Sequence, residues 1–246
     1  MSLNICALIP FYNHPEAIGY VVEKLSIYNL HIIIVDDGSD EGSKLSLKPL
    51  LDLPNVTVVT RAVNGGKGAA VITGMREALK RCYTHTLQVD ADGQHDLEKI
   101  PELLKLSERD PDSIISGMPI YDDSVPTNRK LWRYVTHILV WVHTLSFEIR
   151  DSMCGFRVYP LKKTLKVIDS KNEFGQRMDF DIEILVRSFW ADLRIVQLPV
   201  GVRYPIDGVS HFQLFNDNFL ITKLHIRLFF EMLLNSPKLL LRKVIF

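Results

Sequence analysis

Residues 87–96 read LQVDADGQHD, an apolar run that ends in two aspartates separated by one residue, Asp90 and Asp92. Upstream, residues 31–40 read HIIIVDDGSD, a second β-branched run that ends in acidic residues and glycine. Continuous apolar runs of this kind are typical of strands that crossover helices bury on both faces. Two such strands that both end in carboxylates predict one polar site at a single edge of a sheet.

Strand and helix patterns alternate outward from these two runs. In the first half, strands are predicted at residues 4–9, 31–35, 56–60 and 84–89, with helices at residues 17–30 and 68–83. In the second half, helices are predicted at residues 97–107, 129–147 and 180–190, strands at 112–117, 156–160 and 195–204, and a polar loop at 121–128. This order favours one α/β domain with a mostly parallel sheet and helices on both faces.

Composition excludes several classes of protein. Lys and Arg together number 29, as do Asp and Glu, so no basic field indicates nucleic acid as a partner. The three cysteines, Cys6, Cys82 and Cys154, show neither disulfide nor zinc spacing, which favours a reducing cytoplasm. The N-terminus lacks a signal-peptide pattern. The longest uncharged run, residues 134–147, is shorter than the roughly 20 apolar residues of a membrane span.

Three loops carry groups that could bind a ligand. Asp90 and Asp92 can present two carboxylates to one Mg²⁺ or Mn²⁺ ion, although an ordinary Asp-Gly turn has the same sequence. Asp36 and Asp37 can accept hydrogen bonds from a ribose or a base, or simply cap a helix. Residues 64–68 read NGGKG, and this loop could offer backbone N–H groups and the Lys67 ammonium to a diphosphate.

Six segments in order resemble one family. They are ALIPFYNHPEAI, IIIVDDGSDEGS, NGGKGAAVITGMREA, LQVDADGQHD, RDSMCGFRVY and FDIEIL. Together they are similar to the inverting glycosyltransferases of family 2, which have the GT-A nucleotide-diphospho-sugar transferase fold. Within that family they are most similar to the dolichol-phosphate and polyprenyl-phosphate sugar transferases. The resemblance implies a metal-dependent enzyme that moves a sugar from a nucleotide-sugar donor to a lipid-linked acceptor in cell-envelope glycan biosynthesis.

The resemblance also implies roles for particular residues. On the donor side it assigns nucleotide contacts to Pro10, Tyr12, Asn13, Asp36 or Asp37, Lys67, Asp90, Ala91 and Asp92. The metal ligands would be Asp90 and Asp92, with Gln94 as a third. On the acceptor side, Asp151 and Arg157 belong to a D-x-x-x-G-F-R segment, and Arg129 and Arg203 fall near positions that hold the acceptor phosphate.

The acceptor side departs from the pattern of the lipid-phosphate subgroup. His14, Met118 and His211 stand where the subgroup has glutamate, arginine and lysine. Each change removes or moves a potential phosphate contact, whereas the donor motifs are intact. The identity of the acceptor is therefore less constrained than that of the donor.

Asp179 leaves two mechanisms open. It is similar in placement to the general base of the branch that transfers to hydroxyl groups on glycans or glycolipids, and Asp151 is a second catalytic candidate. An alcohol needs a base to take its proton, whereas an ionised phosphate does not. The rival interpretation places Asp179 and Asp181 at a helix start, where the helix dipole favours negative charge.

The last 29 residues, 218–246, are predicted as a basic amphipathic helical tail after a glycosyltransferase domain of residues 1–217. The tail is expected to be helical up to Pro237 and to continue as a second short segment. Such a tail either lies on an anionic membrane or packs on the domain. A cytoplasmic protein, peripheral at the inner face of the membrane, is the corresponding expectation.

Two other functional classes are less favoured. A nucleotidyltransferase would show its glycine-rich, basic loop directly after the first strand, where this chain has PFYNHPE. A non-catalytic protein that recruits a membrane assembly would not need the intact aspartates at positions 90 and 92.

Overall fold

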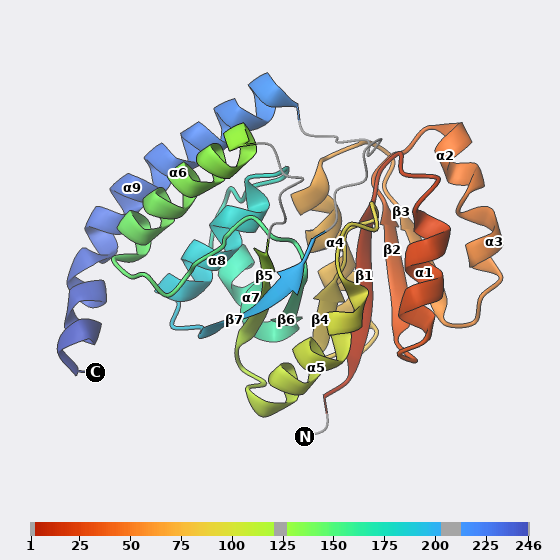
Figure 1. Ribbon diagram of the computed structural model, residues 1–246, viewed down its shortest axis with the longest axis horizontal. Helices are drawn as coiled ribbons and strands as arrows, with labels where there is room; N and C mark the ends of the chain where they lie inside the picture. Colours follow the sequence, from red (N-terminus) through yellow and green to blue (C-terminus); the bar gives the residue numbers. More distant parts are fainter. Residues whose placement is uncertain (1–2, 121–126, 203–212, 246) are drawn as a thin grey trace.

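Helices cover both faces of a seven-stranded sheet of order β3-β2-β1-β4-β6-β5-β7 (Figure 1). The structure, a computed structural model, describes residues 3–120, 127–202 and 213–245. The strands are β1 (Ile5–Phe11), β2 (His31–Asp36), β3 (Val56–Thr60), β4 (His85–Gln88), β5 (Ile114–Ile120), β6 (Arg157–Pro160) and β7 (Ile195–Gly201). The helices are α1 (Ile18–Ser26), α2 (Glu41–Leu45), α3 (Lys48–Leu51), α4 (Lys67–Lys80), the 3₁₀ helix η1 (Leu97–Lys99), α5 (Ile100–Arg109), α6 (Thr127–Thr144), α7 (Leu161–Asp169), α8 (Phe180–Trp190) and α9 (Leu214–Ile245).

The four strands β3, β2, β1 and β4 are parallel, which brings their carboxyl ends to one edge of the sheet. In this register Phe11 lies opposite Asp36, and Leu8 lies opposite Gln88. The loops that follow β1, β2 and β4 therefore start side by side. The predicted mostly parallel α/β architecture is confirmed.

Strand β6 is antiparallel to both of its neighbours, β4 and β5. Its register places Arg157 opposite Gln88, so the chain enters β6 beside the end of β4. The residues that precede β6 consequently lie next to the loop that contains Asp90. This antiparallel pairing brings the D-x-x-x-G-F-R segment close to the loop that contains Asp90 and Asp92.

Side chains of β1 and β2 alternate between two cores, as the two-residue period of a strand requires. Leu8 and Ile33 enter a cluster with residues of α4, α7, α8 and α9. Ile9 and Ile34 enter a second cluster with residues of α1 and α5. Burial on both faces explains why β2 is an uninterrupted apolar run.

Several predicted elements match the structure closely, and a few do not. The predicted strand at 56–60 and helix at 180–190 coincide with β3 and α8. The sequence prediction missed α2, α3 and α7. The loop predicted at 121–128 lies largely outside the described residues.

The predicted break at Pro237 is wrong, because α9 continues through that proline to Ile245. A proline lacks the N–H that would bond to the carbonyl four residues earlier, here that of Leu233. The Ser236 hydroxyl donates to this carbonyl at 2.8 Å and satisfies it. None of the helices in the described parts of the chain combines the length and apolarity needed to cross a bilayer.

Candidate donor site at the carboxyl edge of the sheet

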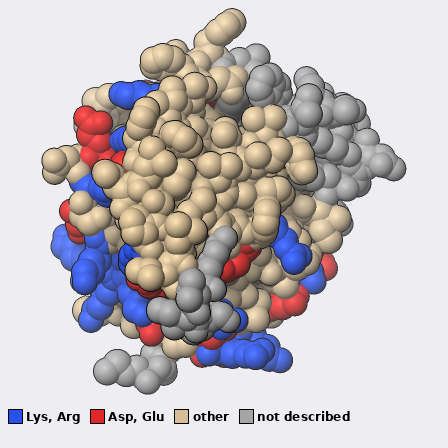
Figure 2. All heavy atoms as spheres, turned by 90° about the vertical axis from the view of Figure 1, so that its left-hand side faces the viewer, with Lys and Arg blue, Asp and Glu red and all other residues tan. Residues whose placement is uncertain are grey.

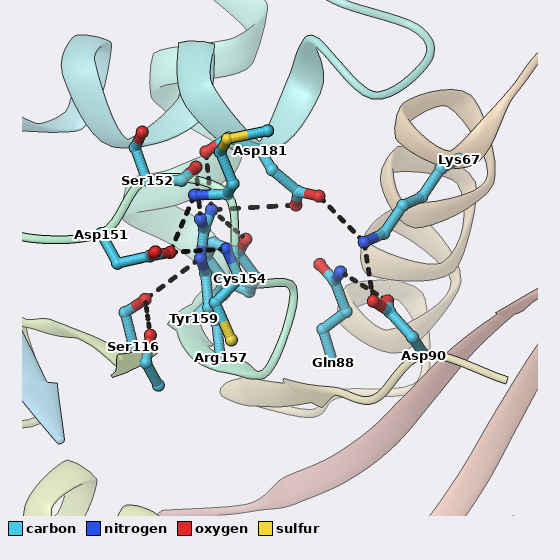
Figure 3. Close-up of polar contacts among 12 residues, drawn as sticks. Lys67, Gln88, Asp90, Ser116, Asp151, Ser152, Cys154, Arg157, Tyr159 and Asp181 are labelled. Carbon is cyan, nitrogen blue, oxygen red and sulfur yellow. Dashed lines mark hydrogen bonds and ion pairs between the residues drawn. The ribbon is translucent and has the colours of Figure 1, made fainter. Parts of the chain in front are cut away.

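Asp90 lies two residues after the end of β4, and its carboxylate is close to Lys67 and Gln88 (Figure 3). Its carboxylate accepts a hydrogen bond from Lys67 Nζ at 2.9 Å and one from Gln88 Nε2 at 3.4 Å. Burial by itself would raise the pKa of Asp90, but the nearby Lys67 and His95 reverse this and hold it well below its usual range. Asp90 is therefore an anion at neutral pH.

Lys67 bridges two carboxylates that are far apart in the sequence. Its ammonium lies 2.9 Å from Asp90 Oδ2 and 2.9 Å from Asp181 Oδ2, and only 15% of its side chain is exposed. Burial would lower the pKa of Lys67, but Asp181 and Asp90 outweigh that effect and raise it. The result is a largely buried cluster of one cation and two anions, which we call the Lys67 cluster.

Glycine at position 155 allows the Lys67 cluster to form. A Cβ atom there would lie 2.5 Å from Lys67 Nζ, 2.7 Å from Gln88 Nε2 and 2.8 Å from Asp90 Oδ1. Such distances are too short for any side chain, so the backbone at Gly155 can approach the cluster only because this residue has no Cβ. The requirement explains the glycine in the D-x-x-x-G-F-R segment.

Asp92 and Gln94 lie on the turn that follows Asp90. Gly93 occupies the left-handed region at φ 69°, and Asp92 Oδ1 accepts from the Gln94 N–H at 3.0 Å. Within residues 3–120, 127–202 and 213–245, no group of three His, Cys, Asp or Glu side chains could hold a metal ion. The expected ligands Asp90, Asp92 and Gln94 would offer two carboxylates and one amide, which are ligand types that Mg²⁺ and Mn²⁺ accept.

Asp37 organises the glycine-rich loop instead of standing open to a nucleotide. Its carboxylate accepts from the N–H groups of Gly65 and Gly66, the latter at 2.7 Å, and pairs with Arg61 at 2.9 Å. Burial dominates these contacts and raises the pKa of Asp37. The neighbouring Asp36 accepts from the Ser39 N–H at 2.9 Å. Both carboxylates are almost fully buried, and the expected contact of one of them with a base or ribose stays a prediction.

The loop after β1 joins the same assembly. The Asn13 N–H donates to Ser39 Oγ at 3.2 Å, and Asn13 Oδ1 accepts from the Asp40 N–H at 3.0 Å. The expected donor-side residues Pro10, Tyr12 and Asn13 are partly exposed here, whereas Ala91 is buried. Asn13 thus links the β1 loop to the β2 loop.

Asp151 is held from several directions. Arg133 of α6 binds both of its carboxylate oxygens, at 2.7 and 2.8 Å, and His137 Nε2 lies 3.4 Å away. The N–H groups of Met153 and Cys154 also donate to it. Burial would raise the pKa of Asp151, but Arg133 and His137 together lower it. A carboxylate with this many donors is suited to shaping a loop and poorly suited to taking a proton.

Arg157 is fully buried, and each nitrogen of its guanidinium donates to the protein. The acceptors are Ser116 Oγ, Tyr159 Oη, the Asp181 carbonyl and the Ser152 carbonyl. These four bonds engage the whole guanidinium, and the expected contact of Arg157 with the acceptor stays a prediction. The side chain of Arg129 and all of Arg203 lie outside the described residues.

Asp179 fixes a local turn at the start of α8. Its Oδ1 accepts from the Arg177 N–H at 2.9 Å, and only 8% of the residue is exposed. Asp181, two residues later, is the residue that meets Lys67. Sequence reasoning assigned Asp181 to the helix dipole, although its place in the FDIEIL motif could have marked it as a site residue. Arg133 carried no comparable signal.

Comparisons with known proteins agree on the family. The profile described as glycosyl transferase family 2 matches residues 6–169. An undecaprenyl-phosphate mannosyltransferase of Micrococcus luteus is 27% identical, with 80% of this chain and 83% of that protein covered. A polyprenol monophosphomannose synthase of Mycolicibacterium smegmatis is 28% identical, with 82% and 78% covered. The structure of glucosyl-3-phosphoglycerate synthase from Mycobacterium tuberculosis, with Mn²⁺, UDP and phosphoglyceric acid, has a TM-score of 0.69 at 14% identity, covering 94% of this chain and 78% of that one.

Proposed function

The chain belongs to glycosyl transferase family 2 and is a glycosyltransferase of the GT-A fold, and from that membership we propose a specific reaction. The enzyme transfers a sugar, with inversion, from a nucleotide-diphosphate donor to a polyprenyl-phosphate type of lipid. The names of its relatives support this choice, since they include an undecaprenyl-phosphate mannosyltransferase and a dolichyl-phosphate N-acetylglucosaminyltransferase of Methanococcus voltae. Because the acceptor is a lipid, the reaction takes place at a membrane surface.

Asp90, Asp92 and Gln94 would hold a Mg²⁺ or Mn²⁺ ion, which neutralises charge on the departing nucleoside diphosphate when it is bound. The observation that carries the proposal is the Lys67 cluster. Lys67 pairs with Asp90, so the surroundings of this carboxylate favour its ionised form, which can also bind a cation. Asp181 holds Lys67 from the other side, and the ammonium can turn to a diphosphate while keeping one carboxylate partner.

Asp37 supports the donor site indirectly. By accepting from two successive backbone N–H groups, it holds the loop of residues 64–68 in one conformation at the start of α4. Helix starts and glycine-rich loops are suited to phosphate groups. Asp37 therefore positions the loop that faces the donor.

On the acceptor side, a lipid phosphate attacks as an anion and needs no general base. Asp151 and Arg133 then form a structural pair that shapes the loop of residues 151–155 beside the donor site. The alternative, a hydroxyl acceptor with Asp179 as base, would require Asp179 to leave its contact with the Arg177 N–H.

Calorimetric titration tests the donor site. We expect UDP, GDP or their sugars to bind much more tightly with Mn²⁺ than without it, and Asp90→Asn to abolish the difference. Asp96→Asn is the matched control, because Asp96 lies on the same segment and only caps η1. If no nucleotide binds in a metal-dependent way, the proposed donor chemistry is wrong. Rates of sugar transfer to a polyprenyl phosphate and to a hydroxyl acceptor are then compared to identify the class of acceptor.

A further inference from the structure

Helices α6 and α9 lie side by side at one end of the molecule and expose an uncharged surface (Figure 2). On α6 the exposed apolar side chains are Tyr134, Val135, Ile138 and Val142. On α9 they are Phe215, Phe219, Ile226, Phe229, Phe230, Leu233, Leu234, Leu240 and Leu241. We call this surface the α6/α9 face. Soluble monomers seldom leave a contiguous apolar area of this kind uncovered, unless it binds something.

The face is not the side on which α9 packs. One stripe of α9, including Leu224, Leu228 and Met232, is buried in the core cluster shared with α4, α7 and α8. The exposed residues recur at spacings of three, four or seven and form a second stripe on another side of the helix. A helix that packs on a domain needs only the first stripe. The second stripe is therefore not needed for the packing of α9 on the domain.

Charge indicates the nature of that partner. The segments of α6 and α9 contain eight Lys and Arg residues against two acidic ones, Asp217 and Glu231. By sequence these two helices carry a formal charge of +6. Four of the basic side chains, those of Arg133, Arg227, Lys238 and Arg242, pair with acidic residues of other elements, whereas Lys223 is exposed on α9. An apolar stripe with basic residues beside it matches an anionic lipid surface. A symmetric dimer through the same face would bury the apolar stripe but bring the flanking basic residues of the two copies together.

Both helices also reach the candidate site from their inner sides. Arg133 of α6 binds Asp151. Asp217, near the start of α9, accepts from Arg177 Nε at 2.8 Å, and Arg177 packs over Gly66 of the donor loop, where a Cβ would lie 2.6 Å from Arg177 Cγ. A surface that rests on α6 and α9 is therefore connected to the loops on both sides of the donor site.

We propose that the α6/α9 face is the membrane-docking surface of this enzyme, and that it lies in the interface of an anionic bilayer. The inference deepens the proposed function and rests on it, because a lipid-linked acceptor must be met at a membrane. It differs from binding through a free basic tail. Helix α9 is packed on the domain, and α6 supplies part of the contact.

The test is co-sedimentation of the full chain with vesicles of phosphatidylcholine, with and without phosphatidylglycerol. Phe230→Gln with Leu234→Gln should lower the fraction bound to anionic vesicles at least about ten-fold, because both side chains are exposed only on the face. Ile138→Gln with Val142→Gln should lower it by a smaller factor, which identifies α6 as part of the surface. Lys223→Gln should weaken binding to anionic vesicles and leave neutral vesicles unaffected.

The matched control is Leu45→Gln with Leu51→Gln, two exposed leucines on α2 and α3 at the opposite end of the molecule (Figure 1). Their loss should leave vesicle binding unchanged, and Lys105→Gln on α5 is the control for charge. Equal losses in the control, wild-type binding in the α6 and α9 variants, or no binding by the wild type would overturn the proposal. A concentration-dependent dimer in sedimentation velocity that the α9 variant abolishes would also overturn it.

Nucleotide binding, measured by calorimetry without vesicles, separates this inference from the proposed function. Metal-dependent nucleotide binding with no vesicle binding would refute the docking surface alone. Vesicle binding without nucleotide binding would refute the donor chemistry and leave the docking surface standing.

Discussion

The Lys67 cluster and the α6/α9 face break the ordinary rule of burial in opposite directions. In the first, charged side chains are withdrawn from water, and Lys67 pairs with Asp90 and Asp181. In the second, apolar side chains such as Phe230 and Leu234 remain in water although the core lies beneath them. Each arrangement costs stability in the isolated protein. The difference indicates two ligands of opposite chemistry, an ionic one at the sheet edge and an apolar one on the helices.

The largest effect on one region alone is expected when the charge of Asp90 is removed. Asp90→Asn removes the charge that Lys67 and a divalent cation both require, and we expect sugar transfer to fall by about 10³-fold, or ~4 kcal/mol. Vesicle binding should not change, because the α6/α9 face is untouched. Initial rates and co-sedimentation on the same preparation check both expectations. A parallel loss of vesicle binding would show that the two regions are not independent.

Two substitutions with opposite expected effects on Mn²⁺ binding test the electrostatics of the Lys67 cluster. Lys67→Met removes a cation that competes for Asp90, so Mn²⁺ should bind more tightly, by about ten-fold, when no nucleotide is present. Asp181→Asn leaves Lys67 to Asp90 alone and should weaken Mn²⁺ binding by about the same factor. Calorimetry measures both, and Asp181→Glu should recover part of the affinity. Shifts of the same sign in both variants would contradict a positioning role for Asp181.

A buried histidine pair beneath the α6/α9 face predicts a dependence of stability on pH. His143 Nε2 and His225 Nδ1 are 3.0 Å apart, and burial lowers the pKa of each imidazole to about 4. Between the ordinary pKa near 6.5 and the folded pKa near 4, the unfolded chain binds more protons, so the free energy of unfolding falls as pH falls. The loss is at most about 3 kcal/mol for each imidazole.

Urea unfolding at a series of pH values measures this loss. His143→Leu with His225→Leu is the comparison, because it keeps an apolar contact between α6 and α9 and removes both titrating groups. In the double variant, the free energy of unfolding should depend less on pH in this range. Carboxylates elsewhere in the protein continue to titrate at lower pH. Identical profiles would assign the pH dependence to groups elsewhere.

The smallest effect is expected from Asp179→Asn. Asn can still accept from the Arg177 N–H through its side-chain oxygen, and a phosphate acceptor needs no base, so transfer should fall by less than about ten-fold. Rates with a phosphate lipid and with a hydroxyl acceptor measure it. Loss of transfer to the hydroxyl acceptor alone would reinstate Asp179 as a general base.

Prediction from sequence succeeded where the signal is local. The apolar run that became β2 and the aspartates after β4 are contiguous in the sequence, and parallel pairing then forces their loops to one edge. It failed where partners are distant. Asp181 meets Lys67 across more than a hundred residues, and Arg157 is buried by four separate acceptors, which no spacing in the sequence reveals.

The sequence by itself determined the α/β fold and the family, and it singled out the two aspartates of the proposed donor site, because strand periodicity and ordered motifs are properties of neighbouring residues. Only the tertiary structure decided which charged side chains are paired within the protein and which apolar side chains remain exposed to solvent. Asp37 binds a backbone N–H of the glycine-rich loop, and Asp151 binds Arg133 of α6. Helix α9 buries one of its two apolar stripes. Pairing and burial depend on distances in space, which the order of residues does not state.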